Sequence, residues 1–293
     1  MKVGVCGTGK MGAAIAQRLI SCGHEVTVWN RSVAKTQPLA SLEANVATSP
    51  AALCEACEVI ITMVLDDAAL GAVYRHANGI LSANLSHRLV VDMSTVLPAT
   101  EEAIAVEVKA KGAAFVECPV GGTVGPAREG RLFGLSGGDE ADVSRARPLL
   151  EQLCRRVEHV GPPGAGARLK LAINLPLLVY WQSLGEALAL CRPLGLPPER
   201  LVDIMADTSG ATAAMKNRAA DVARALSGQL PSAASFDVRA ARKDLSTMVT
   251  YAKTLGLDLP TASAAFKSFD EAALHGLADE DAIAVPARWA TGK

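Results

Sequence analysis

The sequence has no excess of basic residues, since 29 lysines and arginines stand against 30 acidic residues. A nucleic-acid-binding surface needs such an excess to neutralise phosphates, so we expect no nucleic-acid partner. The sequence also lacks an apolar run of the roughly 20 residues that a transmembrane helix needs. Its longest run, from Leu171 to Trp181, is interrupted by Asn174. We therefore expect no membrane partner either.

The pattern of a disulfide framework, a signal peptide or a metal site is also missing. The seven cysteines are an odd number and are not dense enough for a small secreted scaffold. Met1 leads almost directly into a glycine-rich turn, so a cytoplasmic protein is expected. Cys54 and Cys57 have the spacing of a redox pair without its Gly-Pro context, and we interpret them as structural thiols. No metal-ligand spacing is found, so no metal is predicted.

The order of hydrophobic patterns predicts two domains in the 293 residues. The first half alternates short β-branched runs with helical stretches, which is typical of a mainly parallel sheet covered on both faces. Beyond Gly161-Pro162-Pro163-Gly164, helical spacing dominates and no further strand is predicted. The expected strands are 3–6, 25–29, 59–64, 89–93, 114–118 and 131–136, and the expected helices include 11–21, 33–42 and a long one from about 165 to 191.

A glycine-rich turn follows the first expected strand and opens the first expected helix. It matches the pattern G-x-G-x-x-G and consists of Gly7, Thr8, Gly9, Lys10, Met11 and Gly12. Gly7 permits the tight turn, Gly9 lets the backbone approach a pyrophosphate, and Gly12 lets helix and strand pack closely. The N–H groups of the helix N-terminus then face the anion.

These features predict an α/β protein. We expect a Rossmann-type, doubly wound sheet in a dinucleotide-binding domain over residues 1–162. A long interdomain helix should lead into an all-α substrate domain over residues 163–293.

The end of the second expected strand distinguishes between cofactors. An NAD site usually has an acidic residue there, which binds the 2′-hydroxyl of the ribose. This chain has Asn30, Arg31 and Ser32 instead, so no carboxylate repels a 2′-phosphate. The guanidinium of Arg31 offers a planar pair of donors, and its neighbours offer further hydrogen bonds. These residues favour NADP(H).

Lys170 and Asn174 lie four residues apart on the long expected helix and therefore share one face. Their neighbours are almost all apolar, so this helix is expected to be buried. Buried polar side chains need partners or a purpose. Desolvation lowers the pKa of a lysine, which suits the side chain to acid–base catalysis.

Five motifs occur in order at residues 7–12, 92–95, 117–122, 164–174 and 236–245. Together they resemble the motifs of the β-hydroxyacid dehydrogenases over essentially the whole chain. That family includes 3-hydroxyisobutyrate dehydrogenase, tartronate semialdehyde reductase and glyoxylate/succinic semialdehyde reductases, and the imine reductases are related to it.

The resemblance implies hydride transfer between the nicotinamide cofactor and a small β-hydroxyacid, semialdehyde or keto acid. It implies that Lys170 is the general acid/base and that Asn174 holds the substrate oxygen or orients Lys170. It also implies a homodimer or homotetramer, with the long helix and the C-terminal helices at the interface. Besides the glycine turn and residues 30–32, the resemblance places these residues at the cofactor: Met63, Val64, Leu65, Thr95 and Lys243. The residues expected at the substrate are Ser94, Gly121, Gly122, Thr123 and Trp181.

Departures from the family pattern leave the substrate open. Gly121 stands where many members have serine, and Ala240 replaces a usual leucine, so a roomier pocket is expected. Together with Trp181, these departures favour an imine or bulky-ketone reductase as the alternative. The retained Lys170 is evidence against that alternative. A non-catalytic NADPH-binding module is a further alternative, and the retention of both Lys170 and Asn174 counts against it.

Overall fold

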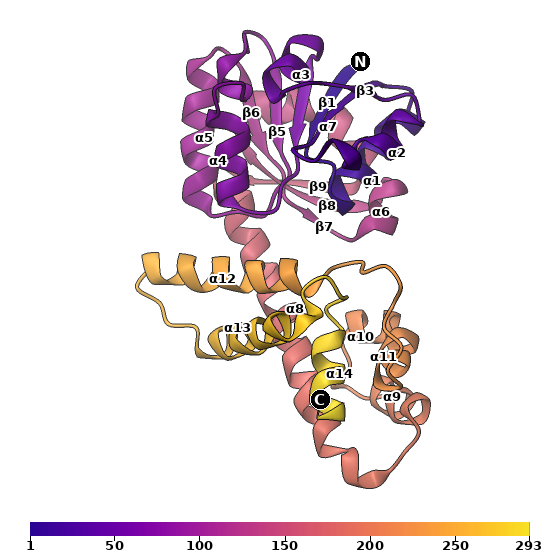
Figure 1. Cartoon of the computed structure of the whole chain (residues 1–293). Coiled ribbons are helices and arrows are strands. Elements are labelled where there is room, and N and C mark those ends of the chain that lie inside the picture. Colours follow the sequence, from indigo (N-terminus) through magenta and orange to yellow (C-terminus); the bar gives the residue numbers. More distant parts are fainter. Residues whose placement is uncertain (293) are drawn as a thin grey trace. The chain divides into compact units, whose positions relative to one another are not determined.

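The computed structural model describes residues 1–292 and separates into two compact units, Met1–Leu171 and Ala172–Lys293. The first unit combines a sheet with helices, and the second is helical (Figure 1). The expected fold class is confirmed. The boundary at residue 162 stays a prediction of where the cofactor-binding domain ends, because the structural division rests on compactness alone.

The first unit is built on a nine-stranded sheet in the order β3-β2-β1-β4-β5-β6-β8-β7, with β9 paired to β8. All neighbours from β3 to β6 are parallel, whereas β8 runs antiparallel to β6 and β7. The strands are β1 (Lys2–Cys6), β2 (Glu25–Trp29), β3 (Asn45–Val46), β4 (Val59–Thr62), β5 (Leu89–Asp92), β6 (Ala114–Glu117), β7 (Val120–Gly121), β8 (Leu132–Gly138) and β9 (Cys154–Gly161). Because β1 lies between β2 and β4, the carboxyl ends of these three strands surround a topological switch point, where such sheets bind ligands.

Alternate residues of the central strands feed two hydrophobic cores. In β4, Val59 and Ile61 belong to one core and Ile60 belongs to the other. The first core contains residues of α1 (Lys10–Ser21), α2 (Gln37–Ala40), α6 (Val124–Arg128) and α7 (Glu140–Leu153). The second contains residues of α3 (Pro50–Ala56), α4 (Asp67–Arg75), η2 (Ile80–Ser82) and α5 (Pro98–Ala110). Helices therefore cover both faces of the sheet, as the doubly wound fold requires (Figure 1).

The second unit is helical. Among residues 172–292 the only strand-like pairing is an isolated bridge between Asp237 and Asp281. α8 (Ala165–Leu190) begins in the first unit and continues into the second. The other elements are η3 (Arg192–Leu194), α9 (Pro198–Ala206), α10 (Ala213–Asn217), α11 (Ala219–Leu226), α12 (Val238–Thr254), α13 (Pro260–Ala272), η4 (Ala273–Leu277) and α14 (Ala284–Thr291). None of the helices in residues 1–292 has the length and apolar character to span a membrane.

Several elements differ from the prediction. The helix expected over 33–42 is divided into η1 (Val33–Lys35) and α2, because Pro38 lacks the N–H that would continue η1 and fits only the first turn of the next helix. β3, β7 and β9 are not among the expected strands. β3 and β7 are only two residues long, and in β9 the charged residues between buried Cys154 and Val157 obscure an apolar pattern.

The cysteine pair Cys54 and Cys57 is buried at the end of α3. Burial raises the pKa of Cys54 to about 12, and burial also raises that of Cys57. Both thiols are therefore protonated at neutral pH and serve as small core residues, as the sequence interpretation holds.

Candidate active site

The glycine-rich turn joins β1 to α1, and its N-cap residue is Gly9, which has no side chain to occupy the first N–H groups of the helix. A Cβ on Gly7 would lie 2.3 Å from the carbonyl oxygen of Met63, and a Cβ on Gly12 would lie 1.8 Å from that of Gly7. Gly7 also has a φ of +100°. At Gly9, by contrast, a Cβ would meet no atom of residues 1–292 within 4 Å. Packing requires the outer two glycines, whereas Gly9 leaves room for a ligand.

A cavity of about 490 Å³ lies beside this turn, at the carboxyl ends of β1, β2 and β4. Its lining includes the predicted residues Gly7, Gly9, Asn30, Arg31, Ser32, Met63, Val64 and Leu65. The other lining residues are Trp29, Lys35, Pro50, Ala69, Ala72, Val73 and His76. The structure thus brings three separate predicted segments together around one cavity, as a dinucleotide site requires.

Asn30, whose contact with the cofactor stays a prediction, connects two loops at this cavity. Its Oδ1 accepts a hydrogen bond from the backbone N–H of Thr8 (3.1 Å), and its Nδ2 donates to the carbonyl of Ser32 (3.0 Å). The Thr8 hydroxyl donates to the carbonyl of Lys35 (3.1 Å). Asn30 and Thr8 therefore tie the loop after β2 to the glycine turn, while Arg31 and Ser32 are exposed at its rim.

The charge of the cavity is positive. Arg31 and Lys35 are both exposed lining residues, His76 is a third basic group, and no carboxylate is among the described residues that line it. Sequence reasoning missed Lys35 and His76, because one lies on η1 and the other is the C-cap of α4. An anionic group of a ligand is favoured at this end of the cavity.

Ser94 supports the wall of the cavity and is fully buried. Its backbone N–H donates to Asp92 Oδ1 (2.8 Å), and its hydroxyl accepts the backbone N–H of Val64 (3.1 Å). Thr62 donates to the other oxygen of Asp92. Ser94 therefore links the segments that follow β4 and β5 and positions Val64, and its expected contact with the substrate stays a prediction.

Three of the predicted substrate residues, Gly121, Gly122 and Thr123, lie at the end of β7 and directly after it. Gly122 has a φ of +126°, which a larger residue adopts only with strain. Thr123 is the N-cap of α6. At Gly121 a Cβ would make only ordinary contacts, the nearest being Phe133 Cβ at 3.7 Å. A serine therefore fits at this position, so the glycine is not imposed by packing.

Lys170 and Asn174 are both buried and lie one turn apart on α8. Asn174 Nδ2 donates to Asp244 Oδ2 (2.9 Å), and Lys243 Nζ lies 2.6 Å from Asp244 Oδ1. A carboxylate accepts only, so Asp244 fixes which end of the Asn174 amide faces it. No role is predicted for Asp244, although it lies within the motif at residues 236–245. Lys243, predicted near the cofactor, lies in this buried network.

The other predicted residues are distributed over both units. Lys10 is exposed at the start of α1, and Met11 packs against the first core. Thr95 is half-buried in the loop after β5. Trp181 is buried in the second unit and makes an edge-to-face contact with Tyr180, with ring centroids 5.9 Å apart.

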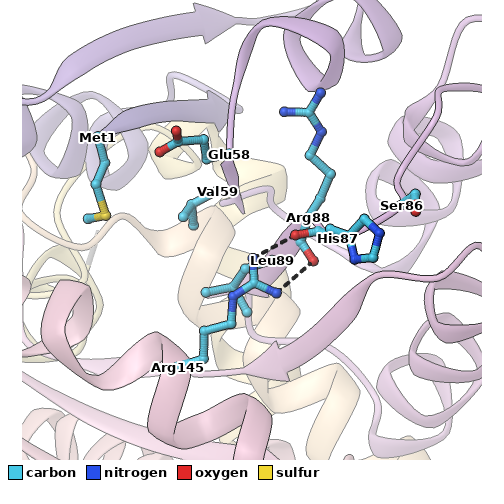
Figure 2. A pocket seen from close by; sticks show the side chains of 8 residues that line it. All are labelled: Met1, Glu58, Val59, Ser86, His87, Arg88, Leu89 and Arg145. Carbon is cyan, nitrogen blue, oxygen red and sulfur yellow. Dashed lines mark hydrogen bonds between the residues drawn. The ribbon is translucent and has the colours of Figure 1, made fainter.

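A second cavity, of about 340 Å³, lies at the amino ends of β4 and β5, the opposite edge of the sheet (Figure 2). Arg145 donates to the carbonyl of His87 (2.6 Å) and reaches that of Arg88 (3.5 Å). Arg88 donates to the carbonyls of Cys57 and Glu55. The Arg145 guanidinium thus binds backbone just before β5, and the Arg88 guanidinium binds backbone at the C-terminal end of α3. Within residues 1–292, no three His, Cys, Asp or Glu side chains are grouped to hold a metal.

The fold and the glycine-lined cavity define a dinucleotide-binding protein with a Rossmann-type domain. The family models agree: residues 2–161 match the NAD-binding domain of 6-phosphogluconate dehydrogenase, and residues 164–288 match the model described as NAD-binding of NADP-dependent 3-hydroxyisobutyrate dehydrogenase. The chain belongs to the β-hydroxyacid dehydrogenase family, whose members are NAD(P)-dependent oxidoreductases.

Individual relatives show the range of the family. Glyoxylate/succinic semialdehyde reductase 1 of Arabidopsis thaliana is 32% identical over 286 residues, which is 97% of each chain. The solved structure of 3-hydroxyisobutyrate dehydrogenase from Salmonella typhimurium superposes with a TM-score of 0.86 at 25% identity and covers 98% of this chain and 99% of its own. An imine reductase from Myxococcus stipitatus shares the fold, with a TM-score of 0.68 at 22% identity over 97% of this chain and 98% of its own.

Proposed function

We propose that the protein is an NADP(H)-dependent oxidoreductase that interconverts a small β-hydroxyacid and its semialdehyde or keto acid. One combination of two structural features supports the proposal. A positively charged dinucleotide cavity occurs in a chain that also holds a buried lysine and asparagine one turn apart on α8. The names of the relatives, a semialdehyde reductase and a hydroxyacid dehydrogenase, support the substrate class.

The residues of this chain would divide the chemistry as follows. The nicotinamide, when bound, supplies or accepts the hydride. Lys170 gives a proton to the carbonyl oxygen during reduction and removes it during oxidation. Asn174, oriented by Asp244, holds that oxygen. The backbone N–H groups of Gly121 and Gly122 bind the substrate carboxylate, since peptide N–H groups suit an anion.

The choice of NADP(H) over NAD(H) rests on the charge at the end of β2. Arg31, Ser32 and Lys35 line the cavity there and supply donors and positive charge for a 2′-phosphate. The glycine turn fits the pyrophosphate, because Gly9 leaves open space beside the helix N-terminus. We assign Thr95 and Lys243 to the nicotinamide half, as the family motifs imply.

Replacing Arg31 with alanine is expected to weaken NADPH binding about 10- to 100-fold, because a charge-assisted hydrogen bond contributes roughly 1.5–3 kcal/mol. NADH binding should change by less than about twofold, since NADH has no 2′-phosphate. Fluorescence titration of both cofactors measures this, with Arg224→Ala on an exposed face of α11 as the matched control. Equal weakening of NADPH and NADH would show that Arg31 does not select the phosphate.

The alternative is a reductase of imines or bulkier ketones. The glycine at position 121 and the alanine at position 240 leave room near the site motifs, and imine reductases share the fold. A substrate panel of semialdehydes, bulky ketones and cyclic imines separates the two. Turnover of cyclic imines alone would favour this alternative.

Replacing Gly121 with serine tests the same distinction. A Cβ fits at this position, and the added hydroxyl can donate to a substrate carboxylate. We expect KM for a carboxylate-bearing semialdehyde to fall about three- to tenfold, in line with a net gain of ~1 kcal/mol per hydrogen bond. Gly210→Ser, where a Cβ would also make only an ordinary contact, is the control. Unchanged KM, or a gain limited to imines, would contradict the expected carboxylate contact.

We also propose a homodimer or homotetramer and a cytoplasmic location, as the family resemblance and the cysteine content suggest. Residues 1–162 would form the cofactor domain and residues 163–293 the substrate and dimerisation domain. Light scattering at several protein concentrations measures the oligomeric state.

A further inference from the structure

Glu117, the last residue of β6, is fully buried and reaches the start of α8. Its Oε1 accepts the backbone N–H of Gly166 at 2.7 Å, and its Oε2 accepts that of Ala167 at 3.3 Å. The first N–H groups of a helix have no partner inside the helix. A carboxylate 49 residues upstream of Gly166 therefore caps the helix that carries Lys170.

Two glycines make the space for this carboxylate. A Cβ on Gly137 of β8 would lie 2.2 Å from Glu117 Oε1. A Cβ on Gly166 would lie 2.3 Å from the carbonyl oxygen of Leu135 and 3.2 Å from Glu117 Oε1. Strand and helix thus both present a glycine to the same side chain. This close approach explains the second glycine of the motif that precedes Lys170.

Lys170 follows Gly166 by four residues and therefore lies on the same face of α8, one turn of about 5.4 Å further on. A rigid helix transmits a displacement of its first turn to the next. A misplacement of about 1 Å at a reacting group can cost on the order of 100-fold in rate.

We propose that Glu117 is a positioning residue of the enzyme: its ionised carboxylate fixes the first turn of α8 and so sets the place of the Lys170 ammonium group. This inference rests on the proposed function of Lys170. The negative charge also suits the positive end of the helix dipole.

The surroundings of Glu117 tie this cap to pH. Burial, together with the nearby charge of Asp92, raises the pKa of Glu117 to about 7, and the N–H groups at the start of α8 oppose this shift. Burial also raises the pKa of Asp92, and burial together with the charge of Asp92 raises that of Glu101. The other charged groups nearby are Glu102 of α5 and Arg168 of α8, which form an ion pair.

The sign of the pH effect follows from the ionised form. As the pH falls through about 7, Glu117 takes up a proton, one oxygen ceases to accept, and the cap weakens. kcat should therefore fall on the acid side. The free energy of unfolding should change in the opposite direction and increase as the pH falls. A carboxyl whose pKa is raised in the folded state contributes stability at low pH that is lost as the pH rises through about 7.

Glu117→Gln tests the proposal, because glutamine keeps the shape of the side chain without its charge. We expect kcat at pH 8 to fall about 10- to 100-fold. The decrease of kcat on the acid side of the pH profile, near pH 7, should be lost. The NADPH dissociation constant should change less than twofold. Glu117→Asp keeps a titrating charge and should retain an acid limb. The melting temperature of the wild-type protein should fall relative to that of Glu117→Gln as the pH is raised from 6 to 8.

The outcomes separate this proposal from the proposed function. If Lys170→Ala is inactive but Glu117→Gln keeps the wild-type kcat and acid limb, the positioning role is wrong while the function stands. If Lys170→Ala keeps full turnover, the proposed function itself fails. A Glu117→Gln protein that loses kcat and cofactor binding together would show a general folding role and would also overturn the proposal.

Discussion

Replacing Lys170 with alanine is expected to lower kcat by about 10²- to 10⁴-fold while leaving the dissociation constant of NADPH nearly unchanged. General acid–base catalysis contributes this much to a typical enzyme, and Lys170 is the buried basic group of the family's lysine motif. The cofactor contacts proposed for the glycine turn and for Arg31 belong to other segments, so NADPH binding should survive.

The experiment needs variants that separate lost chemistry from lost structure. Lys170→Met keeps most of the volume of the buried side chain and should lose kcat as strongly as Lys170→Ala. Lys253→Ala on α12 removes an exposed lysine and should keep the wild-type rate. Single-turnover rates at saturating NADPH, together with a binding titration, give both quantities. Full turnover by either Lys170 variant would refute the assigned role.

The second large effect concerns the glycine turn, where two single-methyl changes should act in different ways. Gly9→Ala is expected to fold normally, because its Cβ meets no atom of residues 1–292 within 4 Å. The methyl group would occupy the space proposed for the pyrophosphate, so NADPH binding should weaken by at least about 100-fold, or ~2.7 kcal/mol.

Gly12→Ala should instead damage the fold. Its Cβ would lie 1.8 Å from the carbonyl oxygen of Gly7, a backbone atom that cannot move without shifting β1 or α1. Overpacking of this kind typically costs about 1–3 kcal/mol of stability. Thermal melts and NADPH titrations of the two variants measure the contrast. Normal NADPH binding by the Gly9→Ala protein would show that the pyrophosphate does not bind at this turn.

The parts of the site that the sequence predicts are those with a local pattern. The spacing of Gly7, Gly9 and Gly12 predicts a strand–turn–helix unit, which the structure contains. Short runs of β-branched and other apolar residues predict the central strands to within two residues at their ends. Lys170 and Asn174 stand out because they are polar residues in an apolar helix, and both are indeed buried.

The parts that the sequence does not predict depend on contacts between distant segments. His76, the C-cap of α4, lines the cavity together with residues that follow β2, far earlier in the sequence. Asp244 acquires a structural role through its hydrogen bond with Asn174, which is 70 residues away in the sequence. Glu117 has no predicted role, and only the fold brings its oxygens to the first N–H groups of α8. Such partners share neither a helical nor a strand period, so periodicity carries no signal for them.

The burial of Ser94 has the same origin. Its place in the motif at residues 92–95 implies a contact with the substrate, which stays a prediction. The structure adds that its hydroxyl accepts the N–H of Val64, after the neighbouring strand β4, and that the side chain is fully buried. A motif predicts that a residue lies near a site, but the packing of neighbouring strands determines which groups its side chain contacts.

The central claim is tested most directly by initial rates of NADPH and NADH oxidation with glyoxylate, succinic semialdehyde, tartronate semialdehyde and a cyclic imine. We predict turnover of at least one of the three carbonyl acids, with NADPH preferred over NADH. Turnover of the cyclic imine alone, or a preference for NADH, would contradict the account.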